Sequence, residues 1–217
     1  MDNGIVPGRR DGETTWLGGN QRYVVCAFYT PNYSEQVERL KLSLERLGIN
    51  YHLKAYERRV TWEATTRIKP QFVAESLARF APLDVLYIDA DGYLHDVPKF
   101  FDTVSTDVAL LFAPVQRRGK HYLSIAAGTL YIRNSEGGRR FAAAWARQDS
   151  AASPLTLDED MIYMAVPEIE GVTFTALPRA YSKIFDAAGP APVIEHFQAS
   201  RGQFKLGRLV RRSRRLG

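Results

Sequence analysis

Two aspartates stand directly after an apolar segment, in the stretch DVLYIDADGYLHDVP at residues 84–98. Asp89 and Asp91 are separated by one residue and are followed by Gly92, so the segment ends in two like charges and a turn. Two carboxylates so close together repel each other, and a divalent cation between them relieves the repulsion. Carboxylate oxygens are ligands that Mg²⁺ and Mn²⁺ prefer. The alternative interpretation is a solvated Asp-Gly turn with no chemical role.

Strand-like and helix-like segments alternate along the chain on both sides of this pair. Branched and aromatic residues predict strands at residues 22–29, 50–56, 84–89, 107–112, 126–133, 171–177 and 192–197. Apolar residues at helical spacing predict helices at residues 34–47, about 70–80, 138–148 and 157–166. This alternation predicts an α/β fold, a three-layer α/β/α sandwich with a largely parallel central sheet. Ligands of such sheets bind beyond the carboxyl ends of strands, which is where Asp89 and Asp91 stand.

Length and composition indicate a soluble globular protein with one main domain. The chain has 217 residues, of which 45% are hydrophobic and 24% charged, and both values are ordinary. Cys26 is the single cysteine, so no intrachain disulfide can form. No apolar run approaches the roughly 20 residues that span a bilayer, and the N-terminal residues do not look like a secretory signal. We therefore expect a cytoplasmic protein.

The basic residues are concentrated at the C-terminal end. Residues 197–217 contain no acid and carry seven cations, Arg201, Lys205, Arg208, Arg211, Arg212, Arg214 and Arg215. The whole chain has a net charge of +5, so the first 196 residues carry −2. We divide the chain into a polar segment at 1–20, a domain at 21–205 and a basic tail at 206–217. The tail is either a solvated end or a contact for nucleic acid or an anionic membrane, at whose surface it would hold the protein.

Several motifs in the same order resemble those of metal-dependent GT-A-fold glycosyltransferases, most closely glycosyltransferase family 8. An Arg-x-Lys before a helix and the D-x-D at a strand end lie within TTRIKPQFVAESLARFAPLDVLYIDADGYLHDVPKFFD. AAGTLYIRN at 126–134 is similar to the family's Asn-Ala-Gly strand. LDEDMIYMAV at 157–166 is similar to its Asp-Gln-Asp helix, and HFQASRGQFK at 196–205 to its closing His-Phe segment. The resemblance spans about residues 22–205.

The resemblance implies a role for each matched residue. Asp89, Asp91 and His196 would bind Mn²⁺ or Mg²⁺. The donor, a UDP-sugar or another nucleotide-sugar, would contact residues from five segments: Ala27, Phe28, Tyr29 and Thr30; Arg67 and Lys69; Asp89; Gly128; Arg201 and Lys205. Catalytic roles near the sugar would fall to Asp158, Glu159 and Asp160. The alternative for these three acids is a purely structural role, because carboxylates in a helix's first turn are favoured by its dipole.

The sequence also departs from the family pattern. Glu159 stands where the family usually has Gln, and Ala126 stands where its sugar-binding Asn is expected. The family's closing Gly and Lys-Pro-Trp pattern is not reproduced by ASRGQFK. A carboxylate at position 159 could stabilise an oxocarbenium-like centre or act as a nucleophile.

We therefore predict an enzyme that moves a sugar from a nucleotide diphosphate, with UDP favoured, to an acceptor hydroxyl with retention at the anomeric carbon. The acceptor stays open among a saccharide, a lipid-linked sugar, a protein and DNA. One alternative is a DNA glycosyltransferase acting on hydroxymethylated bases, which the basic tail favours. A second is a non-catalytic module that binds nucleotide-sugars or nucleic acid.

Overall fold

The computed structural model describes residues 12–117 and 119–202. The predicted tail at 206–217 and Lys205 lie outside the described residues. Residues 1–11 of the predicted segment at 1–20 lie outside them too, and the rest of that segment contains the first strand of the structure, β1 (Glu13–Trp16).

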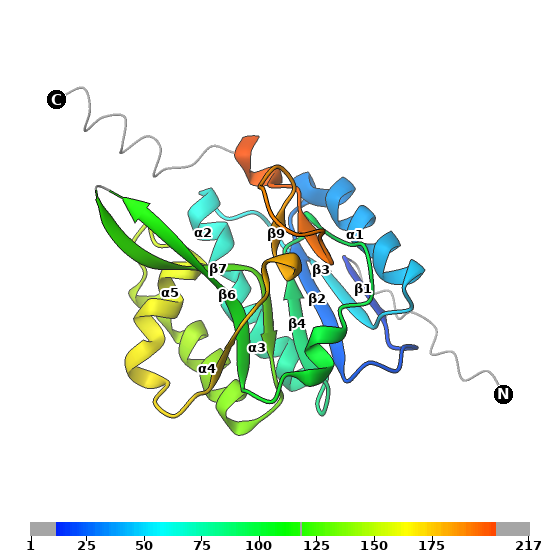
Figure 1. The fold of residues 1–217 in the computed structure, drawn as a ribbon, viewed down its shortest axis with the longest axis horizontal. Coiled ribbons are helices and arrows are strands. Elements are labelled where there is room, and N and C mark those ends of the chain that lie inside the picture. The colour runs from blue at the N-terminus through cyan, green and yellow to red at the C-terminus, as the bar shows by residue number, and fades with distance from the viewer. Residues whose placement is uncertain (1–11, 118, 203–217) are drawn as a thin grey trace.

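A seven-stranded sheet forms the centre of the protein (Figure 1). In spatial order its strands are β1, β3 (Tyr51–Ala55), β2 (Tyr23–Tyr29), β4 (Asp84–Ile88), β7 (Lys120–Ile132), β6 (Val108–Arg117) and β8 (Phe174–Ala176). The pairs β3–β2, β2–β4 and β6–β8 are parallel, and the pairs β1–β3, β4–β7 and β7–β6 are antiparallel. The sheet is therefore mixed rather than largely parallel, but the three strands β3, β2 and β4 run in the same direction, as predicted.

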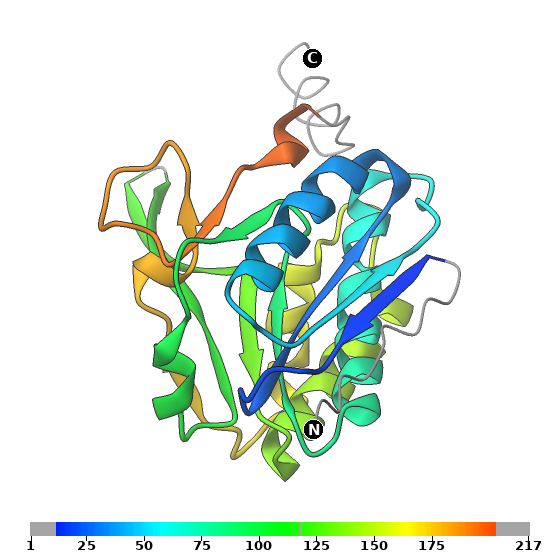
Figure 2. The ribbon, with the colours of Figure 1, turned by 90° about the vertical axis from the view of Figure 1, so that its right-hand side faces the viewer.

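Helices cover both faces of the sheet, which confirms the predicted α/β sandwich (Figure 2). On one face, α1 (Ser34–Arg46) buries Val37, Leu40 and Leu44 against the sheet. On the other face lie α3 (Ile68–Arg79), α4 (Glu136–Arg147) and α5 (Asp158–Ala165). The remaining α-helix, α2 (Trp62–Thr66), is a short turn that precedes α3. The six 3-10 helices of the described residues are Pro31–Tyr33, Lys99–Thr103, Gln148–Ala151, Val166–Glu168, Arg179–Tyr181 and Ala199–Gly202.

Local sequence explains the elements that carry the site. The five residues of β4 are buried, as expected for a strand that is covered on both faces. Helix α1 ends before Gly48, whose φ of +60° is the left-handed conformation that commonly closes a helix. Thr61 begins α2 by accepting a hydrogen bond from the N–H of Ala64 at 3.0 Å.

A second, three-stranded sheet lies on the α1 side of the central one. It consists of β5 (Gly92–Leu94), β10 (Ile194–His196) and β9 (Lys183–Ile184). Leu94 and Ile194 pack in the same core as α1. Because β10 pairs with β5 antiparallel, His196 lies opposite Gly92, although they are 104 positions apart in the sequence. This small sheet joins the end of the chain to the Asp-x-Asp turn.

The predicted strands at 107–112 and 126–133 are parts of one long hairpin, β6 and β7. The register shifts by a bulge between Leu110 and Leu111, and the hairpin projects beyond the sheet in Figure 1. Tyr163 of α5 holds the β7 strand of this hairpin, since the hydroxyl donates to the carbonyl of Leu123 at 3.0 Å and accepts the N–H of Ile125 at 2.9 Å. Among the described residues, no helix has the length and apolar character needed to cross a membrane.

Candidate functional site

The carboxyl end of β4 is the point at which the candidate site begins. Asp89 follows β4 directly, and its N–H donates to the carbonyl of Gly128 in β7 at 2.8 Å. The N–H of Gly92 donates back to the carbonyl of Asp89 at 2.8 Å and closes the turn. Only glycine fits at position 92, because a Cβ there would lie 2.4 Å from Cγ2 of Ile88. The turn therefore depends on Gly92, and it places Asp91 beside Asp89.

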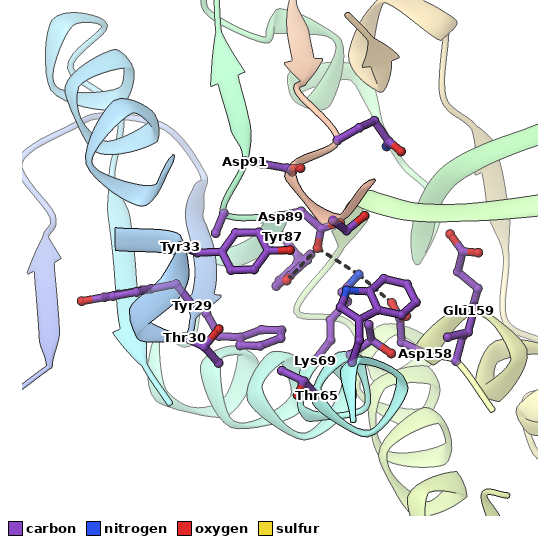
Figure 3. A pocket seen from close by; sticks show the side chains of 17 residues that line it. Tyr29, Thr30, Tyr33, Thr65, Lys69, Tyr87, Asp89, Asp91, Asp158 and Glu159 are labelled. Atoms are coloured by element: carbon purple, nitrogen blue, oxygen red, sulfur yellow. Dashed lines mark hydrogen bonds and ion pairs between the residues drawn. The ribbon is translucent and has the colours of Figure 1, made fainter. Parts of the chain in front are cut away.

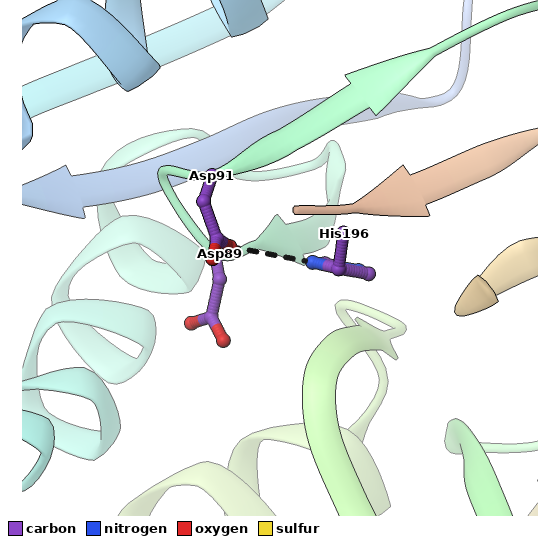
Figure 4. A group of neighbouring side chains, drawn as sticks. All are labelled: Asp89, Asp91 and His196. Carbon is purple, nitrogen blue, oxygen red and sulfur yellow. Dashed lines mark ion pairs between the residues drawn. The ribbon is translucent and has the colours of Figure 1, made fainter. Parts of the chain in front are cut away.

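Asp89, Asp91 and His196 come together at this turn (Figure 4). Each offers one ligand atom, and the three atoms lie within 4.8 Å of one another. Nδ1 of His196 is 3.7 Å from Oδ1 of Asp91, while Nε2 of the ring is 2.8 Å from the hydroxyl of Thr129. The ring is thus oriented by one nitrogen and presents the other to the carboxylates, as second-shell partners do in metal sites.

Gly128 leaves room between the carboxylate and the imidazole. A Cβ at this position would lie 3.3 Å from Oδ2 of Asp89 and 3.4 Å from Cε1 of His196. Both contacts are tight, so any side chain would enter the space between the two groups. An oxygen–oxygen–nitrogen donor set around an open space fits Mn²⁺ or Mg²⁺.

Lys69 is a buried cation that links the metal-binding candidates to helix α5 (Figure 3). Its ammonium lies 3.0 Å from Oδ1 of Asp89 and 2.6 Å from Oδ2 of Asp158, and it donates to the carbonyl of Ala127 at 3.0 Å. The hydroxyl of Tyr87 also donates to Oδ1 of Asp89 at 3.0 Å. Oδ1 of Asp89 is therefore occupied by two donors, whereas Oδ2 lies on the side of Gly128 and His196.

The charges of the site shift one another's pKa values. Burial lowers the pKa of Lys69, but the carboxylates of Asp158 and Asp89 outweigh it and raise the pKa above its ordinary value. Burial raises the pKa of Asp91, but His196 and the N–H of Ala199, which donates to Oδ2 at 2.8 Å, bring it below its ordinary value. Burial and the charge of Asp158 raise the pKa of Glu159 to about 7, against the opposing effect of Lys69. Asp91 is thus held as a carboxylate, while Glu159 titrates near neutral pH.

A cavity of about 250 Å³ opens beside these groups. Aromatic rings form much of its wall, and they come from Phe28, Tyr29, Tyr33, Trp62 and Tyr87. Carboxylates line it as well, from Asp89, Asp91, Asp158 and Glu159. The sequence motifs predict no site role for the other lining residues, which are Tyr33, Trp62, Thr65, Thr66, Tyr87, Ala90, Leu157, Gln198 and Ser200. The spacing of 62, 65 and 66 on one helical turn was a signal for three of them.

The structure places the predicted site residues in three groups. The cavity is lined by Phe28, Tyr29, Thr30, Lys69, Asp89, Asp91, Asp158 and Glu159, and Gly128 and His196 are next to it. Ala27 is fully buried in the core. Three others have structural partners: Arg67 binds Asp149 at 2.8 Å, Arg201 pairs with Asp186, and Asp160 accepts the N–H of Leu157 at 2.9 Å. Lys205 lies outside the described residues.

Comparisons with known proteins bear on the fold. No protein-family description and no curated protein sequence matches the chain. Several solved structures, in contrast, are similar to the chain. A glycosyltransferase involved in the glycosylation of the major capsid of PBCV-1 superposes with a TM-score of 0.65 at 15% identity, over 82% of this chain and 95% of that one. This chain shares the fold of that protein.

Two further solved structures agree. An active-site mutant of LgtC has a TM-score of 0.54 at 12% identity, over 81% of this chain and 87% of that one. The apo-form glycosyltransferase GlyE of Streptococcus pneumoniae has a TM-score of 0.53 at 18% identity, over 86% of this chain and 57% of that one. These similarities concern architecture alone.

Proposed function

We propose that the protein is a metal-dependent glycosyltransferase that takes a sugar from a nucleoside diphosphate, UDP being the expected nucleotide, and transfers it to an acceptor hydroxyl. One observation carries the proposal: Asp89, Asp91 and His196 converge beside a cavity that combines an aromatic wall with the carboxylates of Asp158 and Glu159. The motif resemblance to glycosyltransferase family 8 and the fold of the similar structures support the same function.

Asp89, Asp91 and His196 would hold the cation, either Mn²⁺ or Mg²⁺. A bound divalent cation neutralises charge on a diphosphate and so makes it a better leaving group. The cradle at Gly128 and the Thr129 bond to the imidazole support this assignment, since they keep a space open and orient the ring toward it.

The rest of the cavity suits the other parts of a nucleotide-sugar. Aromatic faces such as those of Tyr29 and Tyr33 stack on a planar base. Asp158 and Glu159, at the N-terminal turn of α5, offer acceptors for sugar hydroxyls. Lys69 joins Asp158 to Asp89, so the sugar-binding and cation-binding sides have a fixed relation.

For the reaction we propose retention at the anomeric carbon. The bond from the anomeric carbon to the diphosphate oxygen breaks with its electron pair on the oxygen, and the acceptor oxygen forms the new bond to the same carbon. The acceptor's proton passes to the leaving phosphate oxygen, so no separate base is needed. Glu159 contributes negative charge beside the developing oxocarbenium when it is ionised.

We assign this function to residues 21–205, with β1 as the outer strand of the same sheet. The predicted acceptor classes all remain compatible with the proposal. The basic tail, which favours a DNA acceptor or a membrane surface, lies outside the described residues and supports no second function here.

The decisive experiment is a screen of nucleotide-sugars for Mn²⁺-dependent hydrolysis, followed by transfer assays with the best donor. Asp91→Asn is the informative variant, because the amide still offers an oxygen to the N–H of Ala199 but loses the charge. We expect Mn²⁺ binding and hydrolysis to fall at least about tenfold with folding unchanged. Asp102→Asn, the same change at an exposed aspartate, is the control.

Two results would contradict the proposal. If Asp91→Asn keeps full Mn²⁺-dependent hydrolysis, the cation site is wrong. If the protein binds UDP with Mn²⁺ but neither hydrolyses nor transfers any donor, it is a binding module rather than an enzyme.

A further inference from the structure

The segment that follows His196 is wrapped around Asp91. The N–H of Phe197 donates to the backbone carbonyl of Asp91 at 3.1 Å, and the N–H of Ala199 donates to its Oδ2 at 2.8 Å. Between these two anchors lies Gln198, whose own carbonyl accepts the N–H of Arg201 at 2.9 Å. The backbone of Gln198 is therefore fixed on both sides.

Gln198 has an unusual backbone conformation for its residue type. Its φ is +54°, and within residues 12–117 and 119–202 it is the one non-glycine residue with a positive φ. This left-handed region is disfavoured by a Cβ and is usually left to glycine. A glycine would therefore fit this backbone better, so the backbone of the described residues gives no reason for a glutamine here.

Few of the described residues that line the cavity are cations that could meet a diphosphate. Lys69 is the one Lys or Arg among the described residues that line the cavity, and it is bonded to Asp89, Asp158 and the carbonyl of Ala127. The guanidinium of Arg67 is bonded to Asp149 and to two carbonyls, and that of Arg201 pairs with Asp186. Gln198 lines the cavity beside Asp91.

We propose that Gln198 is a donor-binding residue whose side-chain amide N–H donates a hydrogen bond to an oxygen of the nucleotide's diphosphate. The inference rests on the proposed function and adds to it a residue that the motif resemblance does not assign. Phosphate oxygens are acceptors only, and an amide supplies two N–H donors without adding a charge. Next to a cation site this neutral donor has an advantage, because an additional positive charge would repel the metal ion.

The test uses Gln198→Gly and Gln198→Glu, with Gln71→Glu as the matched control on the exposed side of α3. Binding of UDP and of uridine, which lacks phosphates, is measured by calorimetry in the presence of Mn²⁺, and Tm is measured for each variant. We expect Gln198→Gly to weaken UDP binding about tenfold, as the loss of one hydrogen bond to a charged group does. Gln198→Glu should weaken UDP binding further, because it places a carboxylate near the phosphates.

The affinity for uridine should be unchanged in all variants, and Gln71→Glu should have the affinity of the wild type for both UDP and uridine. The Tm of Gln198→Gly should equal or exceed that of the wild type, since glycine adopts this φ without a steric cost. Wild-type affinity for UDP in both Gln198 variants would overturn the inference and leave the proposed function intact. Equal losses for UDP and uridine, or a lower Tm in Gln198→Gly, would show a structural role and also overturn it. Failure of the wild-type protein to bind UDP at all would overturn the donor assignment and this inference together.

Discussion

Replacing Lys69 with methionine tests whether the site is held together by one buried cation. The side chain of Lys69 is 6% exposed and that of Asp158 is 7% exposed, whereas Asp89 is 39% exposed. In Lys69→Met the methionine fills the space of the alkyl chain, but Asp158 keeps a buried charge with no cation beside it. Asp89 can be rehydrated and should contribute little to the loss.

The expected cost follows from these contacts. An ion pair this deeply buried costs about 3 kcal/mol when one partner is removed. The carbonyl of Ala127 also loses its donor, at about 1 kcal/mol. We expect the free energy of unfolding in urea at pH 7 to fall by about 4 kcal/mol, which a domain of typical stability survives.

Two further variants make this measurement specific. Lys41→Met removes a lysine from surface pairs on α1 and should cost less than about 1 kcal/mol. Lys69→Met combined with Asp158→Asn removes the orphaned charge and should recover about half of the loss. A cost below about 1 kcal/mol in Lys69→Met, or no recovery in the double variant, would refute the view that Lys69 and Asp158 form a buried pair.

Three other predictions follow from the site and the sequence. Gly128→Ala should lower Mn²⁺ affinity about tenfold in calorimetry with little change in Tm, because the methyl group enters the space between Asp89 and His196. Unchanged affinity would contradict the view that Gly128 keeps this space open for the cation. The pKa of Glu159 is raised from 4.5 to about 7, so the folded state retains a proton that the unfolded state releases, and wild-type stability should fall as pH rises through this window. Glu159→Gln should remove that fall, matching the wild type at pH 4 and exceeding it by about 2 kcal/mol at pH 8 in urea unfolding, and a parallel pH profile would contradict it. Truncation after Lys205 should leave donor hydrolysis intact, and loss of hydrolysis would place the tail in the donor site. If the acceptor is DNA, the truncation should reduce the slope of log affinity against log salt concentration by about 0.9 for each phosphate contact that is lost.

Much of the fold could be predicted because burial leaves a periodic pattern. The apolar run of β4 and the spacing of Val37, Leu40 and Leu44 in α1 gave those elements nearly residue by residue. Strand direction leaves no such pattern, so the antiparallel placement of β7 next to β4 was not predicted. β1 is four residues long and only its first residue is buried, so it was assigned to a polar segment.

The candidate site likewise has a part that the sequence predicts and a part that it does not. A motif places Asp89 and Asp91, because their spacing within a turn fixes where they lie. A motif does not show which other residues of the folded chain bind a long side chain. Arg67 was expected at the diphosphate, but Asp149, 82 positions later, binds its guanidinium. Sequence gives no signal for a partner so distant, and glutamine at 198 carries no motif, so its backbone conformation was visible only in the structure.

Two arginines near the cavity, Arg59 and Arg67, have an architectural task. Asp149 accepts one hydrogen bond from Arg59 at 3.0 Å and one from Arg67 at 2.8 Å, and Arg67 also donates to the carbonyls of Ser153 and Thr156. These bonds join the α2 side of the cavity, which carries Trp62, Thr65 and Thr66, to the segment that leads into α5. Together with Lys69 they fix the width of the cavity from two walls that are far apart in sequence. Because Arg59, Arg67 and Lys69 are paired with carboxylates of the protein, they cannot also neutralise a ligand. Among the described residues that line the cavity, the groups left to meet the charge of a diphosphate are the proposed cation site at Asp89, Asp91 and His196 and neutral donors, so we infer that donor binding depends steeply on the divalent ion.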